Sequence, residues 1–229
     1  MPGERIFDPS HPENLTPVQE ELIGGLYKIQ AVKFGAFPLK LHDKFPEAPK
    51  SPVYIDLRMV PRDVKTKSQA VSVYEELARP LEFDWLAGIP LSAVAMTSSL
   101  SDRLGIGMIT PRTDNKTHGT GAKIDGILPK DSGQTVLVID DLITRADSKI
   151  EAIGVLTANG MVVRDVVVLI DREQGGKEQL AERGVELHSA FTLQQMLDYY
   201  LRVGTIDSSQ YDDTLYRLDE LNQFLGMAS

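Results

Sequence analysis

A buried strand that runs into a pair of aspartates, followed by a helix and a second buried strand, constrains the fold of this chain more than any other feature. Residues 135–139 read Thr-Val-Leu-Val-Ile and lead directly into Asp140 and Asp141. A helix is predicted at about 148–159, and 162–170 is a second strand rich in β-branched residues. Strands that are apolar throughout and joined by a helix are typical of a parallel sheet with helices on its faces. The sequence therefore predicts an α/β fold with a parallel twisted sheet flanked by helices.

Weaker hydrophobic patterns place further elements along the chain. Apolar residues at helical spacing predict more helices, and short apolar or alternating runs predict more strands. The expected helices are 17–29, 65–81, 92–104, 193–202 and 213–224, the expected strands are 53–57, 85–88 and 107–109, and the expected polar loops are 42–51 and 110–126. Residues 1–16 are expected to form a flexible arm, and residues 17–229 a single domain that includes the last helix.

The charge and composition of the chain limit its partners. The formal net charge is −9 over 229 residues, which argues against nonspecific binding to nucleic acid or to an anionic membrane. The absence of cysteine excludes a disulfide, a thiolate zinc site and a cysteine nucleophile. No apolar run approaches the length of a membrane span, and the N-terminus has no hydrophobic signal core. We therefore expect a cytoplasmic protein with neither nucleic acid nor a membrane as its partner.

Charged segments follow both buried strands. The first is Asp-Asp-Leu-Ile-Thr at 140–144, and the second is Asp-Arg-Glu-Gln-Gly-Gly at 171–176. Ligands of open parallel sheets bind beyond the carboxyl ends of the strands, so these segments form the candidate site. Acidic residues before a helix also serve as ordinary caps, and for the aspartate pair alone this interpretation is equally good. Two such strand ends in one sheet favour a ligand site.

The segment 136–144, Val-Leu-Val-Ile-Asp-Asp-Leu-Ile-Thr, resembles the signature of the type I phosphoribosyltransferases. In that family the paired acids contact the ribose hydroxyls of phosphoribosyl pyrophosphate (PRPP), and the following turn binds its 5-phosphate. The resemblance implies that Asp140 and Asp141 bind the ribose and that Thr144 and Ser148 bind the 5-phosphate. It also implies the type I phosphoribosyltransferase fold, with a small N-terminal hood region.

The segment 171–176 is similar to the orotate branch of that family, in which the arginine pairs with the orotate carboxylate. A planar guanidinium suits this role because it donates two parallel hydrogen bonds, which makes Arg172 the expected orotate ligand. Lys40 matches a lysine that helps to hold orotate and PRPP. The segments that agree with this branch lie between roughly residue 20 and residue 200 and include 27–37, 51–58, 88–93, 112–119, 187–189 and 193 onward.

Arg112, Lys116 and His118 match parts of the flexible catalytic loop of the orotate phosphoribosyltransferases. Departure of pyrophosphate leaves an oxocarbenium-like ribose and a highly charged leaving group, and cations that close over the diphosphate stabilise that charge. The resemblance implies that these three residues and Asp141 are catalytic, and that Mg²⁺ is carried by PRPP without a direct protein ligand. It also implies a homodimer in which the loop 110–121 reaches the neighbouring site. Without the resemblance, Lys116 and His118 are better interpreted as a solvated pair.

The turn expected to bind the 5-phosphate departs from the family pattern. Ala146 replaces a glycine, which narrows the backbone conformations available. Asp147 puts a carboxylate where the phosphate would lie, and like charges about 4 Å apart repel by roughly 1 kcal/mol in water. Arg145 would either offset this charge or pair with Asp147 and fill the site itself.

Two further departures also touch anion binding. Thr113 stands where the family commonly has a second cation in the catalytic loop, and an insertion at 41–50 follows Lys40 and would displace it or reshape the pocket. The strands, the aspartate pair and 171–176 are intact.

The sequence leaves three functions open. The first is an enzyme that converts orotate and PRPP, with Mg²⁺, to orotidine 5-phosphate and pyrophosphate. The second is a non-catalytic relative that acts as a binding or regulatory module with a protein partner. The third is an enzyme with another phosphoribosyl acceptor or with a donor that lacks the 5-phosphate.

Overall fold

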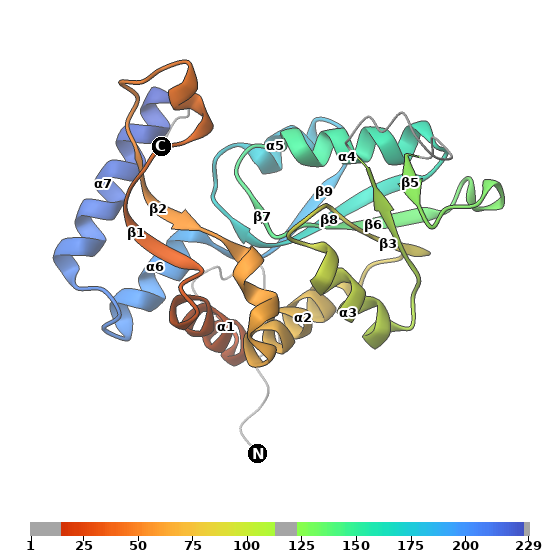
Figure 1. Cartoon of the computed structure of the whole chain (residues 1–229), viewed down its shortest axis with the longest axis horizontal. Helices are drawn as coiled ribbons and strands as arrows, with labels where there is room; N and C mark the ends of the chain where they lie inside the picture. The colour runs from red at the N-terminus through yellow and green to blue at the C-terminus, as the bar shows by residue number, and fades with distance from the viewer. Residues whose placement is uncertain (1–14, 113–122, 227–229) are drawn as a thin grey trace. The chain divides into compact units, whose positions relative to one another are not determined.

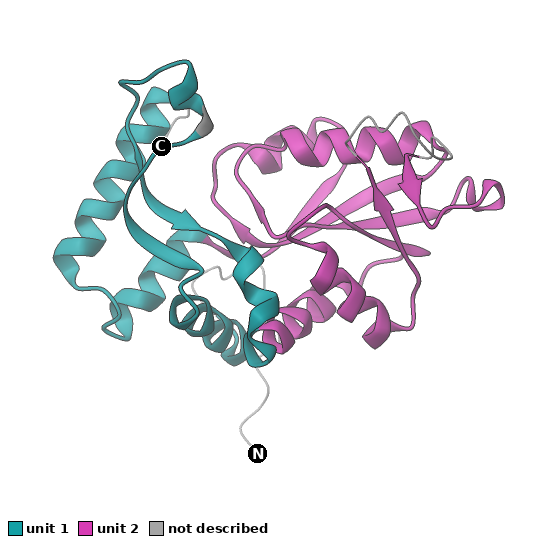
Figure 2. Cartoon of the chain, viewed as in Figure 1, with its two compact units in different colours: residues 1–66, 193–229 teal, residues 67–192 magenta. Residues whose placement is uncertain are grey.

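The computed structural model describes residues 15–112 and 123–226. The chain divides into two compact units, coloured separately in Figure 2. One unit combines residues 1–66 with 193–229, and the other is residues 67–192. A single domain over 17–229 and a flexible arm at 1–16 stay predictions, and most of the arm lies outside the described residues.

The unit at 67–192 is built on a mostly parallel sheet of seven strands, which confirms the predicted α/β class. Its order is β5-β4-β3-β6-β8-β7, and β9 also pairs with β8. All of these pairs are parallel except β4 with β5. The strands are β3 (Trp85–Gly88), β4 (Met108–Pro111), β5 (Ile124–Asp125), β6 (Thr135–Ile139), β7 (Leu142–Ile143), β8 (Val162–Asp171) and β9 (Glu186–Thr192).

Helices cover both faces of this sheet (Figure 1). On one face lie α4 (Asp147–Ala158) and α5 (Gly176–Ala181), whose apolar side chains join those of the strands in one buried core. On the other face lie α3 (Val94–Leu104) and most of α2 (Val64–Ala78). A short 3-10 turn, η3 (Pro129–Asp131), precedes β6. Coverage on both faces explains why the central strands are apolar without alternation.

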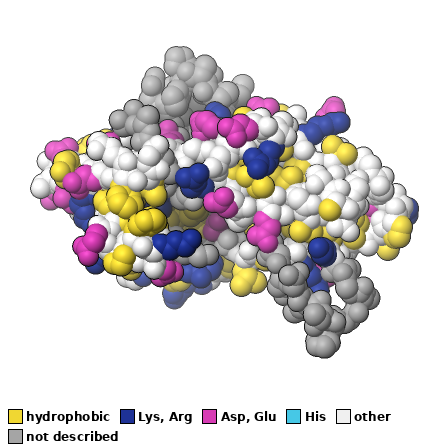
Figure 3. Space-filling model, turned by 90° about the horizontal axis from the view of Figure 1, so that it is seen from above, with side chains coloured by type: hydrophobic (Ala, Val, Ile, Leu, Met, Phe, Trp, Pro, Cys, Tyr) yellow, Lys and Arg dark blue, Asp and Glu magenta, His cyan; other side chains and the backbone are white. Residues whose placement is uncertain are grey.

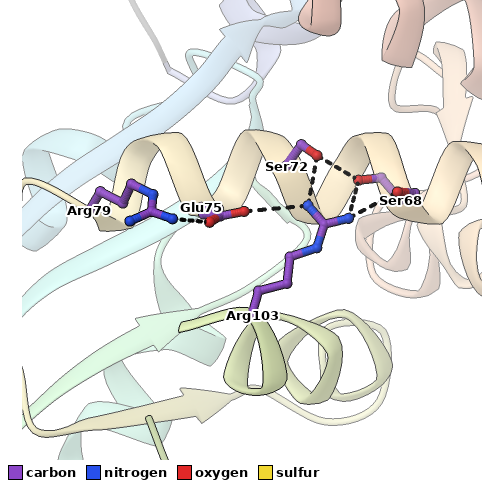
Figure 4. A network of polar contacts seen from close by, with 5 residues as sticks. All are labelled: Ser68, Ser72, Glu75, Arg79 and Arg103. Carbon is purple, nitrogen blue, oxygen red and sulfur yellow. Dashed lines mark hydrogen bonds and ion pairs between the residues drawn. The ribbon is translucent and has the colours of Figure 1, made fainter. Parts of the chain in front are cut away.

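A polar network joins α2 to α3 (Figure 4). The Arg103 guanidinium of α3 donates to Ser72 Oγ at 2.7 Å and to Ser68 Oγ at 2.9 Å, and it lies 3.4 Å from a carboxylate oxygen of Glu75. Arg79 pairs with the other carboxylate oxygen of Glu75. Because these contacts face water, the network helps to orient the two helices and adds little to the free energy of unfolding.

The other unit is an antiparallel pair of strands with helices around it. The strands are β1 (Val32–Phe37) and β2 (Ser51–Ile55), the helices are α1 (Pro17–Lys28), α6 (Leu193–Arg202) and α7 (Ser208–Phe224), and the 3-10 turns are η1 (Lys40–Asp43) and η2 (Leu57–Arg62). The Tyr200 hydroxyl of α6 donates to the Ile23 carbonyl of α1 at 3.0 Å. Arg217 of α7 donates to the Gly35 carbonyl of β1 at 2.6 Å. These two bonds link helices near the end of the chain to elements near its start.

The insertion at 41–50 is a compact turn within this unit. His42 Nδ1 lies 2.9 Å from the Leu39 amide nitrogen, and His42 Nε2 lies 3.0 Å from the Ala48 carbonyl oxygen. His42 Nδ1 also lies 3.0 Å from the Leu39 carbonyl oxygen. The ring of Phe45 meets the ring of Phe224 edge-on, with centroids 6.1 Å apart. The expected loop is therefore held by its own side chains and by the last helix.

Several elements differ from the sequence predictions. The last helix begins at Ser208 and not at residue 213, because the Asp207 side chain accepts the Gln210 N–H at 2.8 Å and caps it. Strand β9 was not predicted because polar residues interrupt its apolar pattern, and α5 is too short to show a helical period. Among the described residues, no helix has both the length and the apolar character needed to cross a bilayer.

The Tyr200 hydroxyl gives a test of the unit that holds both ends of the chain. Tyr200→Phe removes a buried hydrogen bond, and we expect it to lower the free energy of unfolding by about 1 kcal/mol. Tyr216→Phe is the matched control, since its hydroxyl is exposed and bonds Glu220 on the surface. Urea unfolding of the full chain measures both changes. Equal effects of the two substitutions would contradict a role for the bond between α6 and α1.

Candidate active site

Asp140 lies at the carboxyl end of β6 and is almost fully buried, with 4% of its surface exposed. Its backbone is fixed on both sides: the N–H donates to the Val167 carbonyl at 3.0 Å, and the Tyr74 hydroxyl donates to its carbonyl at 2.8 Å. Its carboxylate is engaged as well, since Oδ1 accepts the Asp141 N–H at 2.9 Å and Oδ2 lies 2.6 Å from Lys149 Nζ. Both oxygens of Asp140 are therefore held by the protein.

Lys149 is the partner that the sequence analysis missed. It comes from the first turns of α4, is 4% exposed, and also donates to the Leu142 carbonyl at 2.5 Å. Burial raises the pKa of Asp140 to about 6, the Lys149 ammonium opposes this rise, and the neighbouring Asp141 charge adds to it. Lys149 shares the helix face of Ala152, Ile153 and Leu156, and all three are buried. A lysine in that apolar stripe was the signal that could have revealed a buried charge.

Asp141 is placed differently from its neighbour. It is half-buried, its carbonyl accepts the Leu169 N–H at 3.0 Å, and its Oδ1 accepts the Leu142 N–H at 2.7 Å. Within the described ranges no hydrogen bond reaches its Oδ2. Of the two aspartates, Asp141 is the one with an oxygen available to a ligand.

The turn after the aspartates leads into α4 at Asp147. Thr144 is half-buried, whereas Arg145, Asp147 and Ser148 are exposed. In the part of the chain that the structure describes, Arg145 and Asp147 form no ion pair, so of the two alternatives for Arg145 the one in which it pairs with Asp147 is not seen. The first N–H groups of a helix have no partner within the helix, and at α4 they make this turn suited to an anion.

Ala146 precedes the first residue of α4. Its φ is −87°, a conformation that any residue adopts, so alanine is compatible with the backbone observed in this turn. The side chain is buried, and the backbone N–H donates to Gln179 Oε1 of α5 at 2.7 Å. Gln179 thus fixes the turn from outside, a contact between distant segments that no local pattern could indicate.

The second strand end meets the first, as the sequence predicts. β7 pairs with the end of β8, and the Arg172 N–H donates to the Ile143 carbonyl at 2.9 Å. Asp171 is buried and its Oδ1 accepts the Glu173 N–H at 2.8 Å, which shapes the following turn. Arg172 is partly exposed, and burial lowers the pKa of its guanidinium to about 10, so the side chain keeps its charge at neutral pH.

Gly176 packs tightly against Ile143 and Thr144 in the turn that follows the aspartate pair. A Cβ atom there would lie 2.5 Å from Ile143 Cγ1 and 2.7 Å from the Thr144 carbonyl oxygen. Gly175, the preceding residue, has φ of +85°, which favours glycine. The two glycines of the expected motif therefore have separate reasons to be glycine, and both bring the two strand ends together.

The loop after β3 reaches the same edge of the sheet. The Ile89 N–H donates to the Ile139 carbonyl at 3.0 Å, which places 88–93 beside the aspartate pair. Gly88 packs against Thr97, because an added Cβ would lie 2.7 Å from Thr97 Oγ1. The peptide bond from Pro90 to Leu91 is cis. Three loops of this unit thus converge at one edge.

The remaining predicted residues are only partly placed. Arg112 follows β4, and its guanidinium forms two contacts of 2.7 Å with the Asp125 carboxylate on β5. β4 and β5 pair antiparallel, so the two ends of the segment that was expected to be a polar loop at 110–126 lie side by side. Thr113, Lys116 and His118 lie outside the described residues. Lys40 begins η1 in the other unit, and its side chain is likewise outside them.

Among residues 15–112 and 123–226, one group of side chains could hold a metal ion, and it is not at this edge. The ligand atoms of Asp165, Glu186 and His188 lie within 4.8 Å of one another, and His188 Nε2 lies 2.8 Å from Asp165 Oδ1. Asp165 and Glu186 pair in register on β8 and β9, well before the carboxyl ends of both strands. At the candidate site itself, Asp140 has both carboxylate oxygens engaged by Lys149 and Asp141, and the expectation that Mg²⁺ has no direct protein ligand stays a prediction.

No protein-family model matches the chain. A curated relative does: the orotate phosphoribosyltransferase of Pyrobaculum islandicum is 34% identical over 191 residues, which covers 83% of this chain and 94% of that one. The chain belongs to the orotate phosphoribosyltransferase family. The crystal structure of orotate phosphoribosyltransferase from Aeropyrum pernix agrees, with a TM-score of 0.69, 31% identity, and coverage of 81% of this chain and 99% of that one.

Longer relatives contain the same family unit. The bifunctional enzyme PyrF/PyrE of Nostoc sp. is 35% identical over 83% of this chain, which covers 38% of the relative. The chain also covers 35% of the uridine 5'-monophosphate synthase of Bos taurus. It therefore spans little more than a third of these relatives.

Gly176 provides a test of how the two strand ends are joined. Gly176→Ala would push a methyl group into Ile143 and the Thr144 backbone, and we expect it to lower the free energy of unfolding by about 1–3 kcal/mol. Gly154→Ala in α4 is the control, because its Cβ meets nothing within 4 Å and alanine should stabilise the helix by about 0.4–1 kcal/mol. Thermal or urea unfolding compares the two. A Gly176→Ala protein as stable as the parent would contradict the tight packing of the turns.

Proposed function

We propose that this protein is an orotate phosphoribosyltransferase that converts orotate and PRPP to orotidine 5-phosphate and pyrophosphate. In this reaction the bond from ribose C1 to the pyrophosphate oxygen breaks, and its electron pair leaves with pyrophosphate. A bond forms from the orotate ring nitrogen to C1, and that nitrogen loses its proton. The observation that carries the proposal is the convergence of the aspartate turn and the Arg172 turn, locked by Gly176, in a chain whose relatives of similar length bear this name.

Each part of the site has a role in the proposed reaction. The half-buried carboxylate of Asp141 accepts hydrogen bonds from the ribose hydroxyls. The N–H groups at the start of α4, with the hydroxyls of Thr144 and Ser148, hold the 5-phosphate. Arg172 keeps its charge and binds the orotate carboxylate. Arg112, Lys116 and His118 stabilise the departing pyrophosphate, Mg²⁺ arrives with PRPP, and Lys40 contributes to substrate binding.

The charge of the chain does not oppose this proposal. Basic and acidic side chains are interspersed on the face drawn in Figure 3, so the negative net charge is not gathered at one place there. Arg145 forms no ion pair with Asp147 and is exposed, which leaves its guanidinium available to a phosphate beside the turn. The loop conformation is compatible with alanine at 146. The proposal includes a homodimer and a cytoplasmic location, whereas no observation favours the non-catalytic module or a different acceptor.

Calorimetric titration with each substrate tests the proposal. We expect Mg²⁺-PRPP and orotate to bind with dissociation constants between about 1 µM and 1 mM, the usual range for enzyme substrates. Arg172→Met should weaken orotate binding by at least about tenfold, because a charge-assisted bidentate pair is lost, and should leave PRPP binding nearly unchanged. Glu151→Gln, on an exposed position of α4, is the control. Binding of neither substrate by the parent protein would overturn the proposal.

Asp147 allows a second test, of the charge in the phosphate turn. Asp147→Ser removes a negative charge at the start of α4, and we expect PRPP to bind roughly fivefold more tightly, which corresponds to about 1 kcal/mol. Glu151→Ser removes the same charge one turn later and should have a smaller effect. The ratio of the two dissociation constants at low salt is the measurement. Equal affinities would show that the Asp147 carboxylate does not face the bound phosphate.

A further inference from the structure

We propose that Lys149 is a positioning residue that holds Asp140 away from substrate, so that Asp141 alone binds the ribose hydroxyls. The inference rests on the proposed function and deepens it, because it divides the aspartate pair into a structural member and a substrate-binding member. The family resemblance by itself implies contact from both.

Each oxygen of the Asp140 carboxylate already has a partner within the protein. Oδ2 lies 2.6 Å from Lys149 Nζ, and Oδ1 accepts the Asp141 N–H at 2.9 Å. Asp140 and Lys149 are each 4% exposed, so a ligand would have to displace Lys149 to reach Oδ2 and compete with the Asp141 N–H to reach Oδ1. Separating the pair would leave two uncompensated charges in a place that water does not reach.

Backbone contacts hold this arrangement in place. Tyr74 of α2 donates to the Asp140 carbonyl, and the Val167 carbonyl of β8 accepts the Asp140 N–H. Lys149 is fixed in turn by its bond to the Leu142 carbonyl, two residues beyond Asp140. Lys149 therefore joins α4 to both ends of the Asp140–Leu142 segment.

The carboxylate of Asp141 is more accessible than that of Asp140. The same segment leaves Asp141 half-buried, with Oδ1 on the Leu142 N–H and Oδ2 without a hydrogen bond in the described ranges. The Asp141 carbonyl accepts the Leu169 N–H of β8, so the backbone that carries the carboxylate is held in place. Because the charge of Lys149 balances that of Asp140, the two aspartates together present the charge of one carboxylate to the substrate. That geometry suits one residue that accepts from ribose hydroxyls.

The experiment compares Lys149→Met, the double variant Asp140→Asn with Lys149→Met, and Asp141→Asn. For each, the melting temperature and the dissociation constants of Mg²⁺-PRPP and of Mg²⁺-pyrophosphate are measured. Pyrophosphate lacks the ribose, so it reports on the rest of the site and serves as the internal control.

We expect Lys149→Met to lower the melting temperature by about 5 °C or more, because it leaves Asp140 buried without its partner, and the double variant to recover much of that loss. Asp141→Asn should keep the melting temperature, weaken PRPP by at least about tenfold and leave pyrophosphate unchanged. The double variant should bind PRPP at least several-fold more tightly than Asp141→Asn. If both aspartates bound the ribose and Lys149 served only stability, the double variant would not bind PRPP more tightly than Asp141→Asn.

Two failures are distinguishable. If the parent protein binds no Mg²⁺-PRPP, the proposed function falls and the inference falls with it. If the parent binds PRPP but the double variant loses as much affinity as Asp141→Asn, the inference alone is overturned. No recovery of the melting temperature in the double variant would also overturn it, since the pairing of Lys149 with Asp140 would then not hold the segment.

Discussion

Two opposite charges, on Asp140 and Lys149, lie 2.6 Å apart in a region that is almost closed to water. A lone buried charge is costly, and a buried pair is tolerated only when hydrogen bonds satisfy what remains of each group. Here the Asp141 N–H and the Leu142 carbonyl do so, and both belong to the segment that forms the site. The hydrogen bonds that satisfy the buried pair are therefore the same ones that shape the turn. Lys149, which neutralises Asp140, also fixes the start of α4.

The rest of the edge is arranged around that turn by backbone contacts and close packing. Gly176 admits the second strand end against Ile143, Gln179 holds the Ala146 N–H, and Ile89 donates to the end of β6. The first N–H groups of α4 have no partner within the helix, and in the proposed function they offer a local site to a phosphate on a chain with a net charge of −9. Local dipoles and a few cations decide binding there, and the overall charge bears on steering and solubility.

Much of this architecture was predictable from the sequence, for identifiable reasons. The strand at 135–139 and the helix at 193–202 were predicted at their observed bounds because a buried strand and an amphipathic helix have strong periods. The meeting of 140–144 with 171–176 followed from the parallel sheet. Gln179 and Tyr74 were not predictable, because each acts through a contact with a residue far away in sequence. The effect of Ala146 on phosphate binding stays a prediction, because the φ of this residue shows only that alanine is compatible with the turn.

The central claim is that this edge transfers a phosphoribosyl group to orotate. The most direct measurement incubates the purified protein with orotate, PRPP and Mg²⁺ and quantifies orotidine 5-phosphate and pyrophosphate over time. The account predicts that both products appear in equal amounts, with turnover within the usual enzymatic range of about 1–10³ per second. Intact orotate after prolonged incubation, under conditions in which both substrates bind, would contradict it.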